Sequence, residues 1–321
     1  MPNHVGRREF LATLGGAAVW PLAARADQIA RIGIIDNAPA WDAFRQSLRD
    51  LGYVEGKNIA FEYRYAGGRL HRLATVCAEL VRRPVDLIAT FGTPPTLAAK
   101  QATKTIPIVM IGIGDPVGAG IVPDLARPGG NVTGNTLLGP DLAGKRLHLL
   151  KEVVPSLSRV AFLWNPDNPS QPAQLAELKT AAQTLGMTLL SVQVRSFDQF
   201  ESAFAEILRE HAQALLMTAD PLHQISSMRI IDFLISRRLP GMFMSRELVA
   251  AGGLMSYAAS VPDLFRQGAL YVHRILQGAR PAELPVEQPT KFELVVNLKT
   301  AKAIGVTGPE SFLQRVDETI N

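Results

Sequence analysis

The feature of this chain that most constrains its fold is a regular alternation of short apolar segments with helical segments, beginning at residue 29. The first apolar segment reads RIGIID, and the helical pattern after it places Trp41, Phe44 and Leu48 on one face. Uninterrupted apolar strands that alternate with helices are typical of parallel sheets covered on both faces. The sequence therefore predicts an α/β fold.

The alternation restarts after residue 138, so the chain contains two successive arrays. The first has the strand candidates RIGIID, NIAFEYRY, VDLIATFG and IPIVMIGIGD, and the second has RVAFLWNP, TLLSVQV, ALLMTADP and GMFMS. A chain of 321 residues is too long for one ordinary core and long enough for two. We therefore predict two lobes, each with its own parallel sheet.

The pattern changes again after Gly253. The segment LMSYAAS is followed by a long helical pattern, a proline-rich stretch and a last apolar strand, FELVVNL. A chain that completes both lobes and then returns must cross between them several times, which is the topology of a hinge. The predicted N-terminal lobe comprises 27–138 with 254–285, and the C-terminal lobe comprises 139–253 with 286–321.

Residues 1–26 are interpreted as a twin-arginine-type signal peptide. Arg7 and Arg8 precede a modestly apolar run that ends in the small-x-small pattern of a cleavage site at Ala26. The run is too short and too rich in glycine to span a bilayer stably. We expect a periplasmic protein that begins near Asp27 and lacks a lipid anchor. An amphipathic N-terminal helix is the alternative.

Polar residues follow nearly every predicted strand, at the edge where α/β sheets bind their ligands. The helix that begins at Thr93 would offer free N–H groups and its positive dipole end to an anion such as a carboxylate. Acidic side chains at this edge could receive an ammonium group, and aromatic rings could stack on a flat ligand. The candidate ligand-binding residues are Asp36, Asn37, Trp41, Thr93, Gly114, Asp115, Asn165, Asp220, Glu247 and Tyr257.

Each candidate also has a purely structural interpretation. Asp115 and Asp220 both precede a proline, so either can simply begin a turn. Thr93 can act as a helix cap. Trp41 lies at helical spacing from Phe44 and can belong to the core.

Two glycine-containing segments imitate nucleotide-binding loops. In GIGDPVGAG the third glycine of the dinucleotide fingerprint, Gly118, falls one residue late, and no acidic residue ends a suitable second strand. In GPDLAGKR, Arg146 stands where a hydroxyl would hold magnesium, and no clear strand precedes the segment. We interpret the first as a loop that lets the backbone approach a ligand or the opposite lobe. The second is a turn that enters a helix, and no cofactor is expected.

Composition and absent motifs argue against several function classes. A net charge of +4 gives no reason to expect nucleic acid or an anionic membrane surface as a partner. The chain has no G-x-S-x-G, H-E-x-x-H or C-x-x-C motif, and its six histidines lack metal-ligand spacing. Its one cysteine, Cys77, has core spacing and excludes disulfides within the chain. We expect neither an enzyme nor a metal site.

Five long segments carry a resemblance to a known family. They read GYVEGKNIAFEYRYAGG, DLIATFGTPPTLAAKQATKTIPIVM, DPVGAGIVPDLARPGGNVTG, RVAFLWNPDNP and FELVVNLKTAKAIGV. In these segments, which extend over essentially the whole chain after residue 26, the protein resembles the ABC-transporter substrate-binding proteins of the tryptophan/tyrosine-binding type. The resemblance implies a type I periplasmic-binding-protein fold, with two Rossmann-like lobes joined by a hinge of three crossings.

The resemblance also implies a function. The protein would capture a small molecule, amino-acid-like or aromatic, between its lobes and deliver it to an ABC permease that an ATPase subunit drives. It would meet the membrane only through that permease. In similar folds the ligand contacts come from loops after the strands, which by position are Thr93, Gly114, Asp115, Asn165, Asp220, Glu247 and Tyr257.

Two other function classes stay open. An exported enzyme on the same fold would need a nucleophile and base, and no such pair is recognisable in the sequence. The sensor domain of a repressor shares this architecture, but a repressor needs a helix-turn-helix ahead of RIGIID, where this chain has the export signal.

Overall fold

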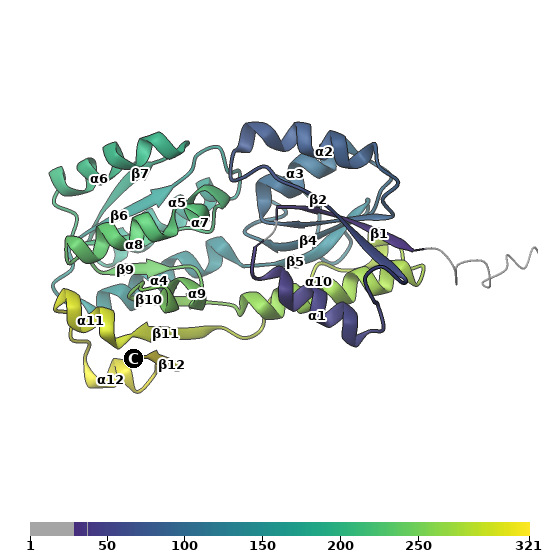
Figure 1. Ribbon diagram of the computed structural model, residues 1–321. Helices are drawn as coiled ribbons and strands as arrows, with labels where there is room; N and C mark the ends of the chain where they lie inside the picture. The colour runs from purple at the N-terminus through teal and green to yellow at the C-terminus, as the bar shows by residue number, and fades with distance from the viewer. Residues whose placement is uncertain (1–28, 37) are drawn as a thin grey trace, which may run out of the picture.

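The computed structural model describes residues 29–36 and 38–321 and shows two α/β lobes side by side (Figure 1). One sheet has the strand order β2-β1-β3-β4-β5, and the other has the order β12-β11-β10-β9-β8-β6-β7. The sheets share no strand, which confirms the predicted α/β class with one sheet per lobe. The predicted signal peptide, 1–26, and the candidate Asn37 lie outside the described residues.

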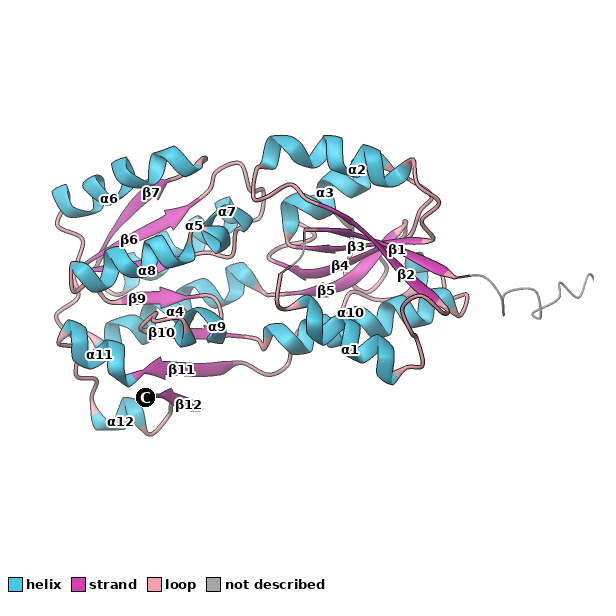
Figure 2. Ribbon diagram, in the orientation of Figure 1, coloured by secondary structure: helices cyan, strands magenta, loops and turns pink. Residues whose placement is uncertain are grey.

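In the N-terminal lobe, all strand pairs of the sheet are parallel. Helices α1 and α10 cover one face of the sheet, and α2 and α3 cover the other (Figure 2). The elements of this lobe are β1 (Ala30–Ile35), α1 (Trp41–Asp50), β2 (Ile59–Arg64), η2 (Leu70–Arg72), α2 (Leu73–Val81), β3 (Leu87–Phe91), α3 (Thr93–Ala102), β4 (Ile108–Ile113), β5 (Val132–Thr136), α10 (Val261–Leu276) and η4 (Pro281–Glu283). Cys77 is fully buried in the core under α2, as its spacing predicts.

In the C-terminal lobe, the sheet is parallel except where β10 pairs with β11. Its two apolar cores lie on opposite faces, one under α4 and α5 and the other under α6 and α8. The elements are α4 (Gly139–Val153), β6 (Arg159–Trp164), α5 (Gln171–Thr184), β7 (Thr188–Gln193), η3 (Phe197–Gln199), α6 (Phe200–Arg209), β8 (Ala214–Met217), α7 (Pro221–Ile225), α8 (Ser227–Ser236), β9 (Gly241–Phe243), α9 (Arg246–Ala250), β10 (Met255–Ala258), β11 (Glu293–Asn297), α11 (Leu298–Ile304), α12 (Glu310–Leu313) and β12 (Glu318–Ile320).

Two of the predicted lobe boundaries differ from the structure. Strand β10, placed by the sequence in the N-terminal lobe, pairs with β9 and β11 and belongs to the C-terminal sheet. Conversely, Glu287 bridges to Asn135 and still lies on the N-terminal lobe. The chain therefore crosses between the lobes at 137–138, 259–260 and 288–292.

The sequence analysis did not predict strand β5, which has the sequence VTGNT. This strand directly precedes GPDLAGKR, the segment from Gly139 that resembles a phosphate-binding loop. Two of the buried polar side chains of β5 find partners in the returning chain. Thr133 Oγ1 donates to the Leu284 carbonyl at 2.6 Å, and Asn135 Nδ2 donates to the Leu264 carbonyl at 2.8 Å. A Cβ atom on Gly134 would lie 1.8 Å from the Met110 carbonyl oxygen, so only glycine fits here. Hydrogen bonding takes the place of apolar burial at Thr133 and Asn135, whereas the buried Thr136 hydroxyl has no hydrogen-bond partner among the described residues.

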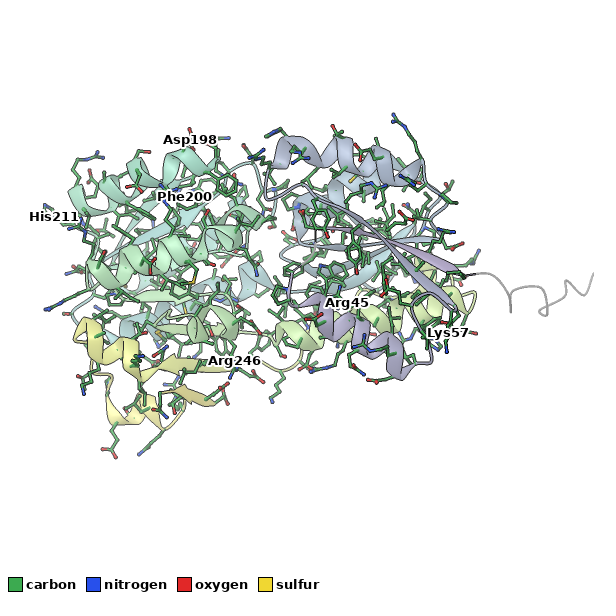
Figure 3. All side chains as sticks on the ribbon, viewed as in Figure 1. Arg45, Lys57, Asp198, Phe200, His211 and Arg246 are labelled. Carbon is green, nitrogen blue, oxygen red and sulfur yellow. The ribbon has the colours of Figure 1, made fainter. Side chains whose placement is uncertain are left out.

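The short edge strand β12 was also not predicted from the sequence. It pairs in parallel with β11 at the end of the chain. Arg246, labelled in Figure 3, holds it from the side, with Nε 2.7 Å from Oε2 of Glu318. This charge-assisted contact links the last strand to α9.

Candidate functional site

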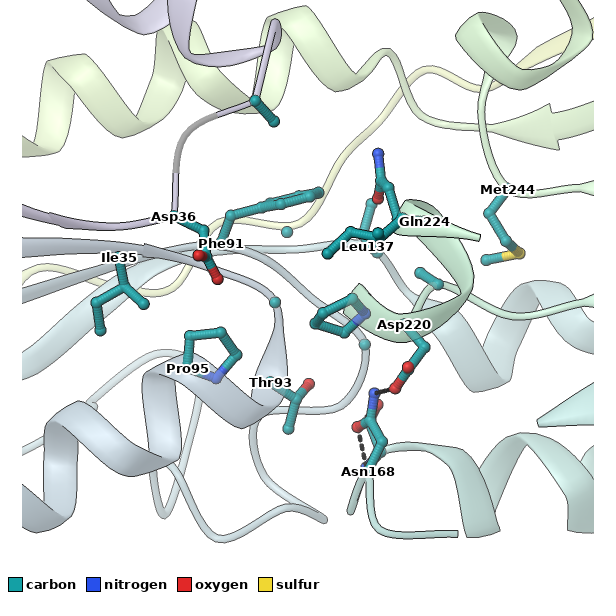
Figure 4. Close-up of a pocket in the computed structure, with 18 of the residues that line it drawn as sticks. Ile35, Asp36, Phe91, Thr93, Pro95, Leu137, Asn168, Asp220, Gln224 and Met244 are labelled. Atoms are coloured by element: carbon teal, nitrogen blue, oxygen red, sulfur yellow. Dashed lines mark hydrogen bonds between the residues drawn. The ribbon is translucent and has the colours of Figure 1, made fainter. Parts of the chain in front are cut away.

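A cavity with a volume of about 240 Å³ lies between the two lobes, beyond the carboxyl ends of their strands (Figure 4). A cavity of roughly 150 Å³ already admits benzene, so a small metabolite with a ring fits. The lining residues are Ile35, Asp36, Ala38, Trp41, Tyr65, Gly67, Phe91, Gly92, Thr93, Pro95, Gly112, Gly114, Leu137, Gly139, Asn168, Ser170, Gln174, Ala219, Asp220, Pro221, Gln224, Ile225 and Met244.

Asp36 lies where β1 ends, and its backbone holds its carboxylate at the cavity. The residue has a φ of 59°, a left-handed conformation that the surroundings must enforce in a residue other than glycine. The enforcing contacts are hydrogen bonds to Oδ1 from the backbone N–H groups of Ala66, at 2.8 Å, and Gly67, at 3.0 Å. One carboxylate oxygen is therefore committed to the loop after β2, and the carboxylate is held in place beside the cavity.

Thr93 begins α3 and faces the cavity with its hydroxyl group (Figure 4). The expectation of several free N–H groups at this helix end was wrong, because Pro94 and Pro95 have none and the Thr96 N–H bonds to the Gly92 carbonyl. The Thr93 N–H and hydroxyl make no hydrogen bond with any described residue. The Thr93 N–H and hydroxyl can therefore donate hydrogen bonds to one anionic oxygen, which the positive end of the helix dipole would also stabilise.

Asp220 supplies the most buried charge of the cavity wall, with 3% of its surface exposed. It caps α7, with Oδ1 2.9 Å from the Leu222 nitrogen, and Oδ2 accepts from Asn168 Nδ2 at 2.9 Å. The side-chain amides of Asn165 and Gln171 lie 3.4 Å away. No Lys or Arg of the described residues forms an ion pair with it. Amide dipoles therefore stabilise this carboxylate while its negative charge stays unneutralised.

The charges of the cavity are all of one sign. Among the described residues that line it, Asp36 and Asp220 are the charged ones, and no Lys, Arg or His takes part. The two carboxylates come from opposite lobes. A cationic group in the cavity would meet no opposing positive charge and could form a charge-assisted hydrogen bond with a carboxylate of either lobe.

The remaining wall is largely apolar and aromatic. Trp41 packs edge-on against Phe44 and Phe265, with ring centroids 5.1 Å and 4.9 Å apart, and is 1% exposed. Its ring serves the core and the cavity wall together. Phe91 is half-buried at the end of β3, tilted against Phe265 at 5.0 Å. Its free face is available for stacking on a flat ligand.

The lobes approach each other closely at glycines beside the cavity. A Cβ atom on Gly114 would lie 2.9 Å from Ser170 Oγ of the opposite lobe. A Cβ atom on Gly68 would lie 2.6 Å from Ile225 Cδ1, again across the lobes. The interpretation of the GIGDPVGAG loop as a site of close backbone approach agrees with the position of Gly114.

The structure brings half of the candidate residues together at the cavity: Asp36, Trp41, Thr93, Gly114 and Asp220. Asn165 lies behind Asp220 and is fully buried, with its backbone N–H bonded to Gln171 Oε1 at 2.7 Å. It orients the carboxylate without lining the cavity.

Three candidates lie elsewhere. Asp115 closes a turn, with Oδ1 accepting from the Gly118 N–H at 2.8 Å, which matches its structural interpretation. Glu247 lines a separate cavity of about 60 Å³ beside α9. The Tyr257 ring packs against Phe292 with centroids 5.9 Å apart, away from the lining of the cavity between the lobes.

Sequence reasoning missed the polar residues that α5, α7 and the loops before them bring to the cavity, namely Asn168, Ser170, Gln174 and Gln224. It also missed the rings of Tyr65 and Phe91. The loop NPDNPSQP after β6 was the available signal, because a polar, proline-rich loop at a strand end is typical of a binding loop.

Two kinds of site find no support in the described part of the chain. No group of three or more His, Cys, Asp and Glu side chains there could hold a metal ion. No helix in residues 29–36 and 38–321 is long and apolar enough to cross a bilayer.

Two α/β lobes, joined by several crossings and separated by a cavity at their strand ends, define a two-lobed ligand-binding protein. A sequence model of the family described as ABC transporter substrate binding protein matches residues 37–320. The chain belongs to this family of substrate-binding proteins.

Relatives and solved structures agree with this assignment. A tyrosine-binding protein of Clostridioides difficile (strain R20291) is 27% identical over 264 residues, which are 81% of this chain and 75% of the relative. The structure of an ABC domain from Streptococcus pneumonia in complex with L-Trp has a TM-score of 0.84 and 27% identity, covering 91% of this chain and all of that one. A conserved domain protein from Vibrio cholerae has the same TM-score and 30% identity, covering 91% and 99% of the two chains. The fold is that of the type I periplasmic binding proteins.

Proposed function

We propose that this protein captures an aromatic or otherwise apolar amino acid, or a closely related amine, and delivers it unchanged to the permease of an ABC importer. The observation that carries the proposal is the pairing of two unneutralised carboxylates with an apolar, aromatic wall in one cavity. The ATPase that drives the permease is a further partner in this proposal. Export by the leader 1–26 would place the protein in the periplasm.

The polar groups suit the two ends of an amino acid. The ammonium group would lie between Asp36 and Asp220, contributed by opposite lobes, and the carboxylate would receive the Thr93 N–H and hydroxyl. The side chain would pack on Phe91 and Trp41. A ligand that bridges both lobes stabilises the closed arrangement over the open one. The tyrosine-binding relative and the L-Trp complex support an aromatic amino acid.

A thermal-shift panel on the mature protein tests the proposal. It compares tryptophan and tyrosine with tryptamine, which lacks the carboxylate, and indolepropionate, which lacks the ammonium group. A true ligand at a hundred times its dissociation constant adds roughly 2.7 kcal/mol to the free energy of unfolding. We expect indolepropionate to give no shift, since nothing in the described lining would neutralise its charge except the Thr93 site.

Variants separate the site from indirect effects. Asp220→Asn and Thr93→Ala should abolish the shift, whereas Glu247→Gln, which alters a carboxylate outside the cavity, should preserve it. A shift that survives both cavity variants would place the ligand elsewhere. Conversion of the bound compound in steady state would favour the exported enzyme instead.

A further inference from the structure

A second cavity lies in the C-terminal lobe, remote from the cleft between the lobes. Its volume of about 280 Å³ matches the 240 Å³ of the first cavity. It opens to solvent and is bounded by the C-terminal segment, α11 to α12, on one side and by the sheet core at β10 and β11 on the other.

The floor of this cavity is apolar. Leu298, Ala301 and Val306, which are half-buried, and the exposed Leu313 are the apolar side chains that a guest can reach, and the buried Met255 and Phe312 lie beneath them. Such a surface offers water almost no hydrogen-bonding partners, and apolar cavities of this kind take up apolar guests. The floor therefore favours an aliphatic group over water.

The rim carries one positive charge. Lys302 on α11 lines the cavity, is exposed, and forms no ion pair with any residue of the described chain. It is the one ionisable residue among the described lining residues. An ammonium group at the mouth of an apolar cavity complements a guest with an anionic head.

Polar contacts outside the cavity hold the covering segment in place. Arg315 Nη1 lies 2.7 Å from Glu152 Oε2 on α4, and Asp317 Oδ2 accepts from the Leu294 N–H at 2.7 Å. Gly305, with a φ of 76°, lets the chain turn sharply after α11. These links anchor the segment at points that do not require its apolar side chains to fill the space beneath it.

We propose that this cavity is a second binding site, and that it takes a small amphiphile with an aliphatic tail and a carboxylate head, such as a medium-chain fatty acid. The tail lies against Ala301 and Leu313, and the head lies beside Lys302. The site is separate from the cleft and does not depend on the identity of the cleft ligand.

Calorimetric titration of the mature protein with octanoate and with uncharged octanol tests this site. Both should bind, because both carry the tail. Ala301→Trp fills the cavity and should abolish both, whereas Ala303→Trp, on the exposed face of the same helix, should change neither. Leu313→Trp is a second filling variant at the rim, used if Ala301→Trp fails to fold.

A charge variant tests the head group. Lys302→Met should weaken octanoate roughly 2- to 5-fold, the size of an exposed ion pair, and leave octanol unchanged. Lys299→Met, an exposed lysine of the same helix outside the lining, should leave both unchanged. Absence of saturable binding, or binding that survives the filling variants, would overturn the site. Equal effects of Lys302→Met on both probes would overturn the carboxylate head, and an octanoate-dependent change of oligomeric state would show instead that this face contacts a second copy.

Discussion

The two lobes contribute different chemistry to the same cavity. The N-terminal lobe provides rings and close backbone, from Trp41, Phe91 and the glycines after its strands, with Asp36 held by the neighbouring loop. The C-terminal lobe provides a buried carboxylate, Asp220, surrounded by side-chain amides and a serine hydroxyl. The N-terminal lobe therefore supplies most of the surface on which a ligand packs, together with one partly buried carboxylate, and the C-terminal lobe supplies the more deeply buried charge.

Removal of the buried charge of Asp220 should weaken ligand binding more than the other substitutions. Asp220→Asn keeps the shape and an oxygen for the Leu222 N–H, but it leaves the ligand ammonium without its most buried partner. We expect the dissociation constant to rise about 100-fold, or about 3 kcal/mol, in calorimetry. Asp36→Asn should cost about 10-fold, because this carboxylate is less buried and already shares one oxygen with the backbone. Equal losses from both variants would contradict the greater contribution of the more deeply buried carboxylate.

The elements that the sequence predicted well are those whose stability comes from local apolar patterns. The runs RVAFLWNP and RIGIID became β6 and β1 because their side chains are buried between helices on both faces. Strand β5 could not be predicted, since Thr133 and Asn135 are buried by partners 151 and 129 residues away. Patterns within a short window carry no trace of such partners.

The same distinction between local and distant causes applies to the residues of the candidate site. Asp220 was predictable because it stands directly at a strand end, and Asn168 and Gln174 were not, because a loop and a helix bring them to the cavity. Glu247 also follows a strand, but α9 directs it to another cavity. A strand end therefore predicts the edge at which a residue lies but not the side toward which it points.

Loss of ring stacking tests the contribution of the N-terminal lobe to ligand binding. Phe91→Ala removes the half-buried ring that faces the cavity, and should raise the dissociation constant of an aromatic ligand about 10-fold. The preference for tryptophan over indolepropionate should persist, since the carboxylates are intact. A variant that loses this preference would show that the ring also positions the ligand for its contacts with the carboxylates.

The contact between the lobes at Gly114 predicts a smaller effect. Gly114→Ala adds a methyl group 2.9 Å from Ser170 Oγ and should hold the lobes apart, weakening ligand roughly 3- to 10-fold and raising the radius of gyration of the liganded protein in X-ray scattering. Gly130→Ala, whose methyl group would meet nothing within 4 Å, is the matched control. Ser170→Gly should restore affinity in the Gly114→Ala background. Failure of this rescue would mean that the methyl group acts within its own lobe.

The smallest expected effect is on the pH dependence of stability and concerns His223, which lies on α7 in the C-terminal lobe. The imidazole is fully buried, and both ring nitrogens lack a hydrogen-bond partner within the described chain. Burial lowers the pKa of His223 below its ordinary value of 6.5, and the nearby Asp220 carboxylate opposes this only in part. Below pH 6.5 the unfolded chain therefore binds a proton that the folded protein resists. The contribution of the neutral imidazole to the free energy of unfolding is fully present above pH 6.5 and is lost as the pH drops, by no more than about 1.4 kcal/mol per pH unit.

Thermal melts of His223→Leu between pH 7.5 and 5.5 should show a shallower decline than wild type, whereas His71→Gln, which replaces an exposed histidine, should follow wild type. A decline of equal slope in His223→Leu would mean that the folded and unfolded chains protonate this imidazole alike. A steeper decline in the variant than in wild type would mean that Asp220 holds the imidazole in its protonated form in the folded protein, and the charge of this carboxylate would then be neutralised in part before any ligand arrives.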